Sequence, residues 1–351
     1  MKRMINFLSE NANPSIVYRV KKEILQDISE KEEKVLQEKI MQEKIVKSIV
    51  ECQKENGWLG NGYHGGNKNA GQYTNMEAGV KYLAEKGVRK DSDVLKRAMG
   101  AFKELPNTDP CYRGTWNIND EFKYAANGAN LFRCACIARA GYEDYIDIKP
   151  QIQLALDSFK RVLEVDSILD ITRLVKKGTK RVFNNFEKWP CRYHLDILAH
   201  TNSWKTEENS KMIAKAVHKI MRTDRPELVG VHADSWVGYV LGTCGCFPSQ
   251  GFKVVDMADG IPHYHMEYLV WLARCGAVKY SLELQKIVKT IYDSVNKEGI
   301  CEIAVHDYIF KDWGTYAGLQ LEVDWKSKTK RNCDITFRAL QLCYYAGINI
   351  D

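Results

Sequence analysis

Four apolar helical patterns in this chain end in the same way, with a glycine directly after the last periodic residues. They read YLAEKG, CIARAG, WLARCG and CYYAG, and they end at Gly87, Gly141, Gly276 and Gly347. A glycine one position past a helix commonly takes the left-handed conformation that closes the last turn. After the first three glycines a short turn leads into a second amphipathic pattern. The sequence therefore predicts a helical hairpin that is used repeatedly.

Two of these hairpins also begin alike. Tyr193–Leu198 reads YHLDIL and Tyr264–Leu269 reads YHMEYL, and a proline stands shortly before each stretch. The two stretches begin 71 residues apart, and the same 71 residues separate Gly276 from Gly347. This spacing corresponds to about two hairpins of roughly 35 residues, a length typical of helical repeats.

Helical periodicity extends through most of the chain and predicts an all-α fold. We expect helices over Asn11–Asp27, Glu32–Cys52, Asn75–Lys86, Asp91–Lys103, Gly128–Ala140, Lys149–Glu164, Pro190–Thr201, Glu207–Arg222, Pro262–Cys275, Lys279–Val295 and Arg331–Ala346. Asn13 and Pro14 suit the cap and the first position of the first helix. Ser167–Phe186 is compatible with a helix or with an excursion into short strands, and Pro226–Gly260 is rich in loop residues.

The stretch Gln53–Gly66 joins two of the predicted helices and reads QKENGWLGNGYHGG. Its Gln-x-x-x-Gly-Trp pattern resembles the repeat turn of squalene cyclases and protein prenyltransferases, and Val295–Cys301 has a similar form without the tryptophan. The resemblance implies an α/α toroid, in which inner helices ring a central cavity and outer helices cover them. We expect one such domain over residues 1–351, with five or six hairpins and with residues 1–52 completing the ring.

The motifs that carry activity in those families are absent from this sequence. Class II terpenoid cyclases use an Asp-x-Asp-Asp acid, and the nearest stretch here is Asn117–Asp120. Prenyltransferases hold zinc with Asp, Cys and a His on a late inner helix, and Arg331–Ala346 contains no histidine. The resemblance therefore implies the fold and neither activity. We expect no cofactor and no zinc held in the family's manner.

An acidic residue among aromatic residues marks one face of the two hairpins that begin alike. At 100° per residue, Glu267 lies on the face opposite Met266 and Leu269, and Asp196 and His200 lie on the corresponding face of the earlier helix. An acid held in a cavity has a raised pKa and can transfer protons, so Glu267, Asp196 and His200 are the catalytic candidates. Alternatively, the carboxylates cap the starts of their helices.

The ligand-binding candidates share an aromatic or polar side chain on an inner face or in a rim loop. They are Tyr193, Tyr264, Tyr268 and Trp271 on the two helices, Arg338 on the last helix, and Arg192, Trp58, Trp189, Trp313, His232 and Asp234 in or beside loops. Rim loops of a toroid converge over the cavity mouth, where aromatic and acidic groups suit a ligand. The alternative is that the tryptophans seal the ends of helices.

A metal site is a further alternative. Cys244, Cys246, His263 and His265 supply zinc-binding atoms, but two histidines at i and i+2 on a helix point about 200° apart. Buried free cysteines are the preferred interpretation. The eleven cysteines and the lack of a signal-peptide core at the N-terminus favour reduced thiols and a cytoplasmic protein.

Charge and function classes complete the sequence-based expectations. The 51 basic and 45 acidic residues are spread along the chain, which does not indicate nucleic-acid binding, and no apolar run is long enough for a membrane span. The leading expectation is an enzyme that acts by acid/base chemistry on a small or medium organic molecule. Terpenoid-like cyclisation or isomerisation and sugar chemistry are its two candidate reactions. The alternative is a non-catalytic protein that binds a ligand or partner.

Overall fold

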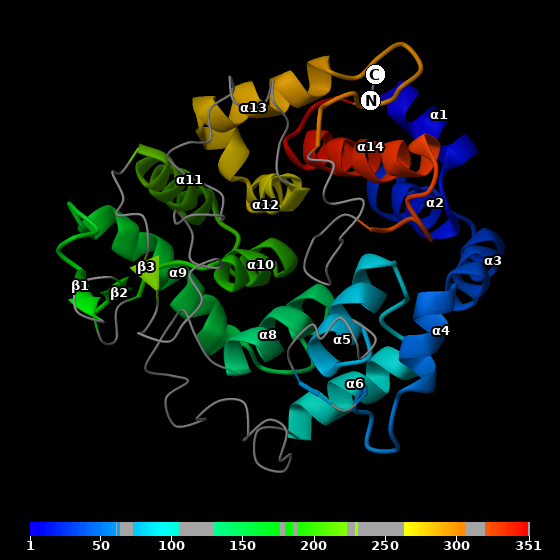
Figure 1. Cartoon of the computed structure of the whole chain (residues 1–351), viewed down its shortest axis with the longest axis horizontal. Helices are drawn as coiled ribbons and strands as arrows, with labels where there is room; N and C mark the ends of the chain where they lie inside the picture. The colour runs from blue at the N-terminus through cyan, green and yellow to red at the C-terminus, as the bar shows by residue number, and fades with distance from the viewer. Residues whose placement is uncertain are drawn as a thin grey trace. The chain divides into compact units, whose positions relative to one another are not determined.

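The computed structural model describes residues 1–60, 62–63, 73–104, 129–175, 180–184, 188–222, 229–230, 263–305 and 320–349. These residues are mostly helical, which confirms the predicted all-α class (Figure 1). The chain divides into two compact units, each assembled from separate stretches. Unit 1 comprises residues 1–115, 259–270 and 287–351, and unit 2 comprises residues 116–258 and 271–286.

Unit 1 contains the first helices of the chain and the last one. Its helices are α1 (Lys2–Asn11), α2 (Pro14–Arg19), a π-helical turn (Val20–Leu25), α3 (Glu30–Met41), α4 (Lys44–Glu51), α5 (Met76–Glu85), α6 (Asp93–Glu104) and α14 (Lys328–Tyr345). Helix α14 packs against α1 and α2, and α5 packs against α4 and α6. Each pair buries apolar side chains, such as Met4 and Leu8 of α1, which are fully buried.

Unit 2 combines helices with a small sheet. Its helices are α8 (Ala129–Arg139), α9 (Lys149–Glu164), α10 (Arg192–His200) and α11 (Glu207–Arg222), and α10 packs against both α8 and α9. Strands β1 (Thr172–Val175) and β2 (Lys180–Phe183) pair antiparallel, and β2 pairs in parallel with β3 (Val229–Gly230). Ser167–Phe186 is therefore an excursion with short strands. Helices α12 (His263–Arg274) and α13 (Leu282–Asp293) contribute residues to both units.

The glycine caps predicted from the sequence are confirmed. All four glycines have positive φ, between 74° and 81°: Gly87, Gly141, Gly276 and Gly347. At Gly87 the glycine N–H donates to Ala84 O, and the next N–H, of Val88, donates to Leu83 O, both at 3.0 Å. The same two bonds follow α8 and α14. They satisfy carbonyl groups that a helix end would leave open, so each helix stops at a defined residue.

Three boundaries differ from the prediction. Helix α1 was not expected from the sequence. Asn13 does cap α2, accepting the Ile16 N–H at 3.0 Å, but α2 gives way to a π-helical turn at Val20. The helix expected over Glu32–Cys52 is two helices, because Glu43 takes an extended conformation between α3 and α4. The break places the Glu43 carboxylate on Lys86 and on the Ser15 hydroxyl.

The turns Gln53–Leu59 and Val295–Cys301, which follow α4 and α13, have the same form. Each is closed by an isolated antiparallel bridge between its first and last residues. Gly57 and Gly299 occupy equivalent places in the two turns and have φ of 87° and 85°. The two turns are thus alike in backbone structure as well as in sequence. The second turn has no tryptophan, so the tryptophan of the first turn does not determine this backbone structure.

Each of these turns places its glycine against the backbone of a neighbouring helix. A Cβ at Gly57 would lie 2.1 Å from the carbonyl oxygen of Arg97 in α6, and a Cβ at Gly299 would lie 2.1 Å from that of Arg3 in α1. The guanidinium groups of Arg97 and Arg3 also donate to backbone carbonyls of the two turns, at 2.6 Å and 3.3 Å. Within unit 1, α1 therefore contacts the turn Val295–Cys301 in the same way that α6 contacts the turn Gln53–Leu59.

Candidate functional site

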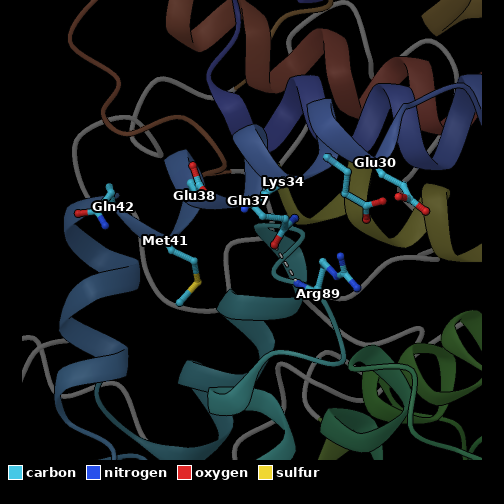
Figure 2. A pocket seen from close by; sticks show the side chains of 8 residues that line it. Glu30, Lys34, Gln37, Glu38, Met41, Gln42 and Arg89 are labelled. Atoms are coloured by element: carbon cyan, nitrogen blue, oxygen red, sulfur yellow. Dashed lines mark hydrogen bonds between the residues drawn. The ribbon is translucent and has the colours of Figure 1, made fainter.

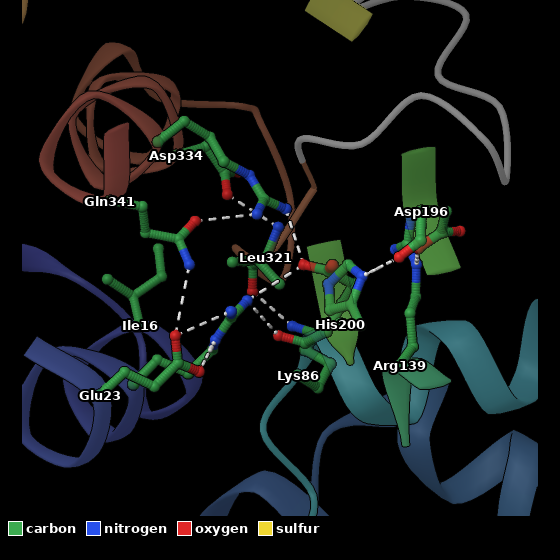
Figure 3. A network of polar contacts seen from close by, with 12 residues as sticks. Ile16, Glu23, Lys86, Arg139, Asp196, His200, Leu321, Asp334 and Gln341 are labelled. Carbon is green, nitrogen blue, oxygen red and sulfur yellow. Dashed lines mark hydrogen bonds and ion pairs between the residues drawn. The ribbon is translucent and has the colours of Figure 1, made fainter. Parts of the chain in front are cut away.

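A buried carboxylate with two partners forms the candidate site in unit 2. Asp196 on α10 accepts from Arg139 Nε of α8 at 2.7 Å, and His200 Nδ1, one turn later on α10, lies 3.0 Å from the same Asp196 oxygen (Figure 3). The side chains of Arg139, Asp196 and His200 are 4%, 1% and 8% exposed. A charge this deeply buried requires such partners, because burial without them costs several kcal/mol.

The hydrogen bonds of His200 determine which of its ring nitrogens carries the proton. Nδ1 lies 2.8 Å from the backbone oxygen of Asp196 and 3.0 Å from its carboxylate, and both of these oxygens are acceptors. Nδ1 must therefore be the donor. In the neutral imidazole Nε2 is then the unprotonated nitrogen, which can accept a proton or a hydrogen bond.

Trp271 of α12 adds an aromatic surface to this site. The Arg139 guanidinium lies 4.8 Å from the centre of the Trp271 ring, in cation–π contact, and the His200 ring meets the same indole edge-on at 6.1 Å. We call Arg139, Asp196, His200 and Trp271 the Asp196 cluster. All four residues belong to unit 2.

The charge state of His200 follows from its surroundings. Burial lowers the pKa of the imidazole to about 4, the positive charges of Arg274 and Arg139 act in the same direction, and only Asp196 opposes them. His200 is therefore neutral at neutral pH. The Asp196 cluster combines an ionisable acid, an oriented neutral imidazole, a guanidinium and an indole, which is a set suited to proton transfer beside a bound molecule.

Sequence reasoning identified Asp196, His200 and Trp271 but missed Arg139. The signal that was available is the pair ARAG and ARCG, in which Arg139 and Arg274 both stand two residues before the cap glycine. The ion pair itself joins residues 57 positions apart. Helical periodicity gives no information about such a contact, because it describes one element at a time.

The structure also decides between the carboxylate roles considered for α10. His194, not Asp196, caps the helix, because its Nδ1 accepts the backbone N–H of Cys191 at 3.2 Å. The capping interpretation is therefore wrong for Asp196. His194 is thus a hydrogen-bonded residue of the first helical turn.

Three of the other candidates on α10 and α12 are buried, namely Tyr193, Glu267 and Tyr268. Glu267 and Tyr268 are each 2% exposed. Tyr193 packs on Phe132 with ring centres 4.3 Å apart, and the Arg192 guanidinium lies 5.5 Å from the Tyr193 ring centre. The structure thus gathers Tyr193 and Arg192 at the start of α10, whereas Asp196 and His200 lie along the rest of the helix.

Two of the loop tryptophans pack inside their units. Trp58 is 2% exposed and contacts Tyr63 and Phe102 with ring centres 5.9 Å and 6.4 Å away. Trp189 is 3% exposed and stacks on Phe183 of β2 at 6.0 Å. Both contacts match the alternative in which tryptophans seal the ends of elements.

Arg338 lies in a closed ring of polar contacts in unit 1. Its guanidinium donates to Glu85 at 2.9 Å and to Gln341 at 3.0 Å; Gln341 contacts Glu23 at 3.4 Å. Arg19 completes the ring, 2.6 Å from Glu23 and 3.0 Å from Glu85. The two cations and two carboxylates balance, so the positive charge expected from Arg338 is neutralised by Glu85.

Unit 1 also buries a second set of ionisable groups that the sequence did not reveal. Lys86, directly after α5, donates to Glu43 and to Leu321 O (Figure 3). Asp334 of α14 accepts the backbone N–H of Leu321 at 2.7 Å and that of Glu322 at 3.2 Å. Glu322 in turn accepts the Asn13 N–H at 2.9 Å.

We call Glu43, Lys86, Glu322 and Asp334 the Lys86 cluster. Lys86 and Asp334 are fully buried, and Glu322 is 1% exposed. Burial raises the pKa of Glu322 to about 7, with the nearby Asp334 charge acting in the same direction. Burial likewise raises the pKa of Asp334 to about 6, against the opposing hydrogen bonds from Trp325 and the backbone. Three carboxyl groups here share one lysine.

A pocket of about 930 Å³ opens along α3 in unit 1 and contains none of the predicted site residues (Figure 2). It is lined by Glu30, Glu33, Lys34, Gln37, Glu38, Met41, Gln42 and Arg89. Several of these side chains already have partners in the protein. Gln37 donates to Gly87 O at 2.7 Å, Arg89 pairs with Asp91, and Glu33 accepts from Lys22 at 3.0 Å. Several of the side chains that line the pocket are therefore engaged in contacts within the protein.

Some predictions concern residues outside the described part of the chain. They are His232, Asp234, Trp313, Cys244, Cys246 and the side chains of Tyr264 and His263. Among the described residues, no group of three or more His, Cys, Asp and Glu is placed to hold a metal ion. Within the same residues, no helix combines the length and the apolar character needed to span a bilayer. The described cysteines are all free thiols.

Comparison with known proteins gives no relative from which a role could be transferred. The chain matches no protein-family model, no curated protein and no solved structure.

Proposed function

We propose that this protein is an enzyme that moves a proton on a small or medium organic molecule, with His200 as the base. The observation that carries the proposal is the hydrogen bonding of His200 Nδ1 to two acceptors of Asp196, which leaves Nε2 to receive the proton. Asp196 then acts as a positioning residue that stabilises the imidazolium formed.

The low pKa of His200 narrows the class of reaction. An imidazole with a pKa of about 4 gives its proton back readily, because the charged form is disfavoured by burial and by Arg274. An imidazole with so low a pKa is a weak base that holds a proton only briefly, so the proposal is limited to reactions that remove a proton and return it, such as isomerisation. Trp271 is 2% exposed and holds the Arg139 guanidinium against its ring, so a carbocation-like or ring-bearing ligand would have to take the place of that guanidinium. A terpenoid-like or a sugar substrate fits this description.

We also propose that the two units together form the α/α toroid implied by the resemblance. The equivalent turns at Gly57 and Gly299 support it, as do the four helices that end in left-handed glycines. The packing of α1 on α14 supports it too, since a closed ring needs a first helix beside a last one. A crystal structure with these helices in two separate globular domains would contradict the proposal.

A non-catalytic ligand-binding protein is the second candidate. The contact between Arg139 and Trp271 favours it, because the same pair can hold an anionic or aromatic molecule without any proton transfer. The two candidates differ in which residue matters. An enzyme depends on His200 Nε2, whereas a receptor depends on the Trp271 ring.

A thermal-shift screen against metabolite collections, followed by product analysis for each binder, tests the proposal. His200→Asn keeps a donor near the Nδ1 position and removes Nε2, so turnover should fall at least a hundredfold while ligand affinity changes little. Trp271→Leu should weaken affinity in both candidates. Glu267→Gln serves as a parallel test of the other predicted acid. Ligand binding without turnover in the wild type would favour the receptor.

A further inference from the structure

The segment that precedes α14 in unit 1, residues 320–325, has an irregular backbone with a buried side and an exposed side. Leu321, Glu322 and Trp325 are 1%, 1% and 8% exposed, whereas Val323, between them, is 46% exposed. We call residues 320–325 the strap. The buried side of the strap thus carries a carboxyl group, that of Glu322.

Asp334 of α14 holds the strap from one side. Its carboxyl group accepts the backbone N–H of Leu321 at 2.7 Å and that of Glu322 at 3.2 Å, and it also accepts the indole N–H of Trp325. Three donors of the strap therefore meet one fully buried carboxyl group, and these bonds are strongest when that group is charged.

Lys86 and Asn13 hold the strap from the other side. Lys86 donates to Leu321 O (Figure 3), and so does the side-chain amide of Asn13. The backbone N–H of Asn13 donates in turn to the Glu322 carboxyl group at 2.9 Å. The strap is therefore held by polar contacts, and two of the acceptors, Glu322 and Asp334, can gain or lose a proton.

The buried charges around the strap do not balance when every carboxyl group is ionised. Lys86 is fully buried and pairs with Glu43, which leaves Glu322 and Asp334 without a cation of their own. A buried carboxylate without a cation is costly, so a retained proton is favoured. Asp334 has three N–H donors and Glu322 has one, so Glu322 should keep its proton to the higher pH. Burial raises the pKa of Glu322 to about 7 and that of Asp334 to about 6, in the same order.

Other titratable groups face these two carboxyl groups from the neighbouring elements. The charge of Lys330 acts against the raised pKa of Glu322, but its side chain is 33% exposed and already pairs with Asp324 at 2.9 Å. The remaining groups are the Cys333 thiol and the hydroxyls of Tyr73 and Tyr82, all with pKa values raised by burial. In the described part of unit 1, these groups therefore add no second buried cation to the Lys86 cluster.

We propose that the strap is a latch controlled by pH, which stays docked while Glu322 and Asp334 hold protons and detaches once both have lost them. A detached strap places both carboxyl groups in water, where their pKa values return to the ordinary range. The docked form thus holds protons that the detached form has lost, so docking is strongest at low pH and weakens as pH rises through 6 and 7. Detachment admits water to Lys86 and frees the Asn13 N–H between α1 and α2.

Hydrogen exchange of the full chain, followed by mass spectrometry at pH 5.5 and pH 8, tests the proposal. After correction for the intrinsic effect of pH on exchange, the protection of the strap amides should fall roughly a hundredfold between the two values, given the two raised pKa values. Glu322→Gln keeps the acceptor for Asn13 but cannot ionise. This variant should reduce the change to roughly fourfold, which is the share of Asp334.

The matched control is Asp324→Asn, which removes a half-buried carboxylate from the same strap and should keep the wild-type change. Low concentrations of urea separate detachment from unfolding. Detachment exposes little surface, so exchange of the strap at pH 8 should not depend on urea, whereas exchange of α14 should accelerate with it.

Two results would overturn the proposal. One is a strap whose exchange shows the same urea dependence as α14, because the strap would then open only when the unit unfolds. The other is a wild-type change with pH in a folded Glu322→Gln variant. If circular dichroism shows that this variant does not fold, the urea comparison on the wild type decides the matter.

Discussion

Unit 1 and unit 2 each bury a set of ionisable side chains, and the two sets balance charge in opposite ways. In the Asp196 cluster one carboxylate pairs with one guanidinium beside a neutral imidazole, and Arg274 adds a further positive charge that acts on His200. In the Lys86 cluster three carboxyl groups share one lysine, so the acidic groups are in excess. Further titratable groups are coupled to this cluster, among them Lys330 and Cys333 of α14 and the hydroxyls of Tyr73 and Tyr82.

The difference has a direct consequence for proton binding. Burial, together with the positive charges of Arg274 and Arg139, lowers the pKa of His200 to about 4. Burial, together with the negative charge of Asp334, raises the pKa of Glu322 to about 7. Burial makes both shifts large, since it penalises the charged form in each case. The same chain therefore buries an imidazole, His200, that is unprotonated at neutral pH and a carboxyl group, Glu322, that keeps its proton up to a pH of about 7.

Replacement of Lys86 by Met should have the largest effect. The variant leaves three buried carboxyl groups without their cation, which costs about 3–5 kcal/mol of unfolding free energy at pH 7. The loss should shrink at pH 5, where Glu322 and Asp334 are protonated. Urea unfolding at the two pH values measures it. Lys44→Met, at an exposed site on α4, should change stability by less than about 1 kcal/mol. Equal losses at pH 5 and pH 7 would contradict the shared-lysine account.

Replacement of Arg139 by Met should cost about 3 kcal/mol, because a single buried carboxylate loses its guanidinium. The pKa of His200 should rise at the same time, since one positive charge that lowers it is gone and Asp196 gains influence. Urea unfolding and NMR titration of the His200 ring measure the two effects. Arg161→Met removes a surface pair with Glu164, 3.7 Å apart, and should cost less than about 1 kcal/mol. An unchanged His200 pKa would show that Arg139 does not tune it.

The pH dependence of unit 1 should follow Glu322. Its ordinary pKa is 4.5 and its folded pKa is about 7, so between these values the folded chain holds a proton that the unfolded chain has lost. Stability from this group is thus complete below pH 4.5 and is lost as pH rises through 7. Glu322→Gln should remove a change of roughly 3 kcal/mol across this window, seen in urea unfolding at several pH values. If the Glu322→Gln variant kept the wild-type dependence of stability on pH, the proton would have to be assigned to another group.

The pH dependence of unit 2 should run the other way. Between pH 6.5 and 4 the unfolded chain binds a proton that the folded chain does not bind at His200, so stability falls as pH falls through this window. His200→Asn should flatten the acid side of the profile by roughly 3 kcal/mol, because the shift in pKa is as large as that of Glu322. The double variant with Glu322→Gln should lose both slopes additively, because the two groups lie in different units. A non-additive result would indicate coupling between the units.

The parts of the fold that depend on local chemistry could be predicted from the sequence. Glycine caps such as Gly87 and the Asn13 cap follow from conformational preferences within one helix turn. Asp196 and His200 were paired correctly because i and i+4 residues share a face of any helix. The break between α3 and α4 was missed, because its cause is the contact of Glu43 with Lys86, 43 residues away.

The site could be predicted only to the same extent. The aromatic and acidic residues of α10 were recognised, but Arg139 comes from another helix and the periodicity of α10 cannot report it. The Lys86 cluster was invisible for the same reason, since its members come from the break before α4, the end of α5, α14 and the segment before α14. Burial itself decides which charges matter, and burial depends on the assembled unit rather than on any one stretch.

The contact between Arg3 and the turn at Asn296 has a consequence for how the protein forms during synthesis. The two residues are 293 positions apart, so α1 leaves the ribosome long before the segment that it must meet. At 5–20 residues per second this interval is roughly 15–60 seconds. During it the apolar face of α1, with Met4 and Leu8, has no α14 to cover it. Completion of unit 1 is therefore a late event, which has to wait until the segment that carries α14 has been made.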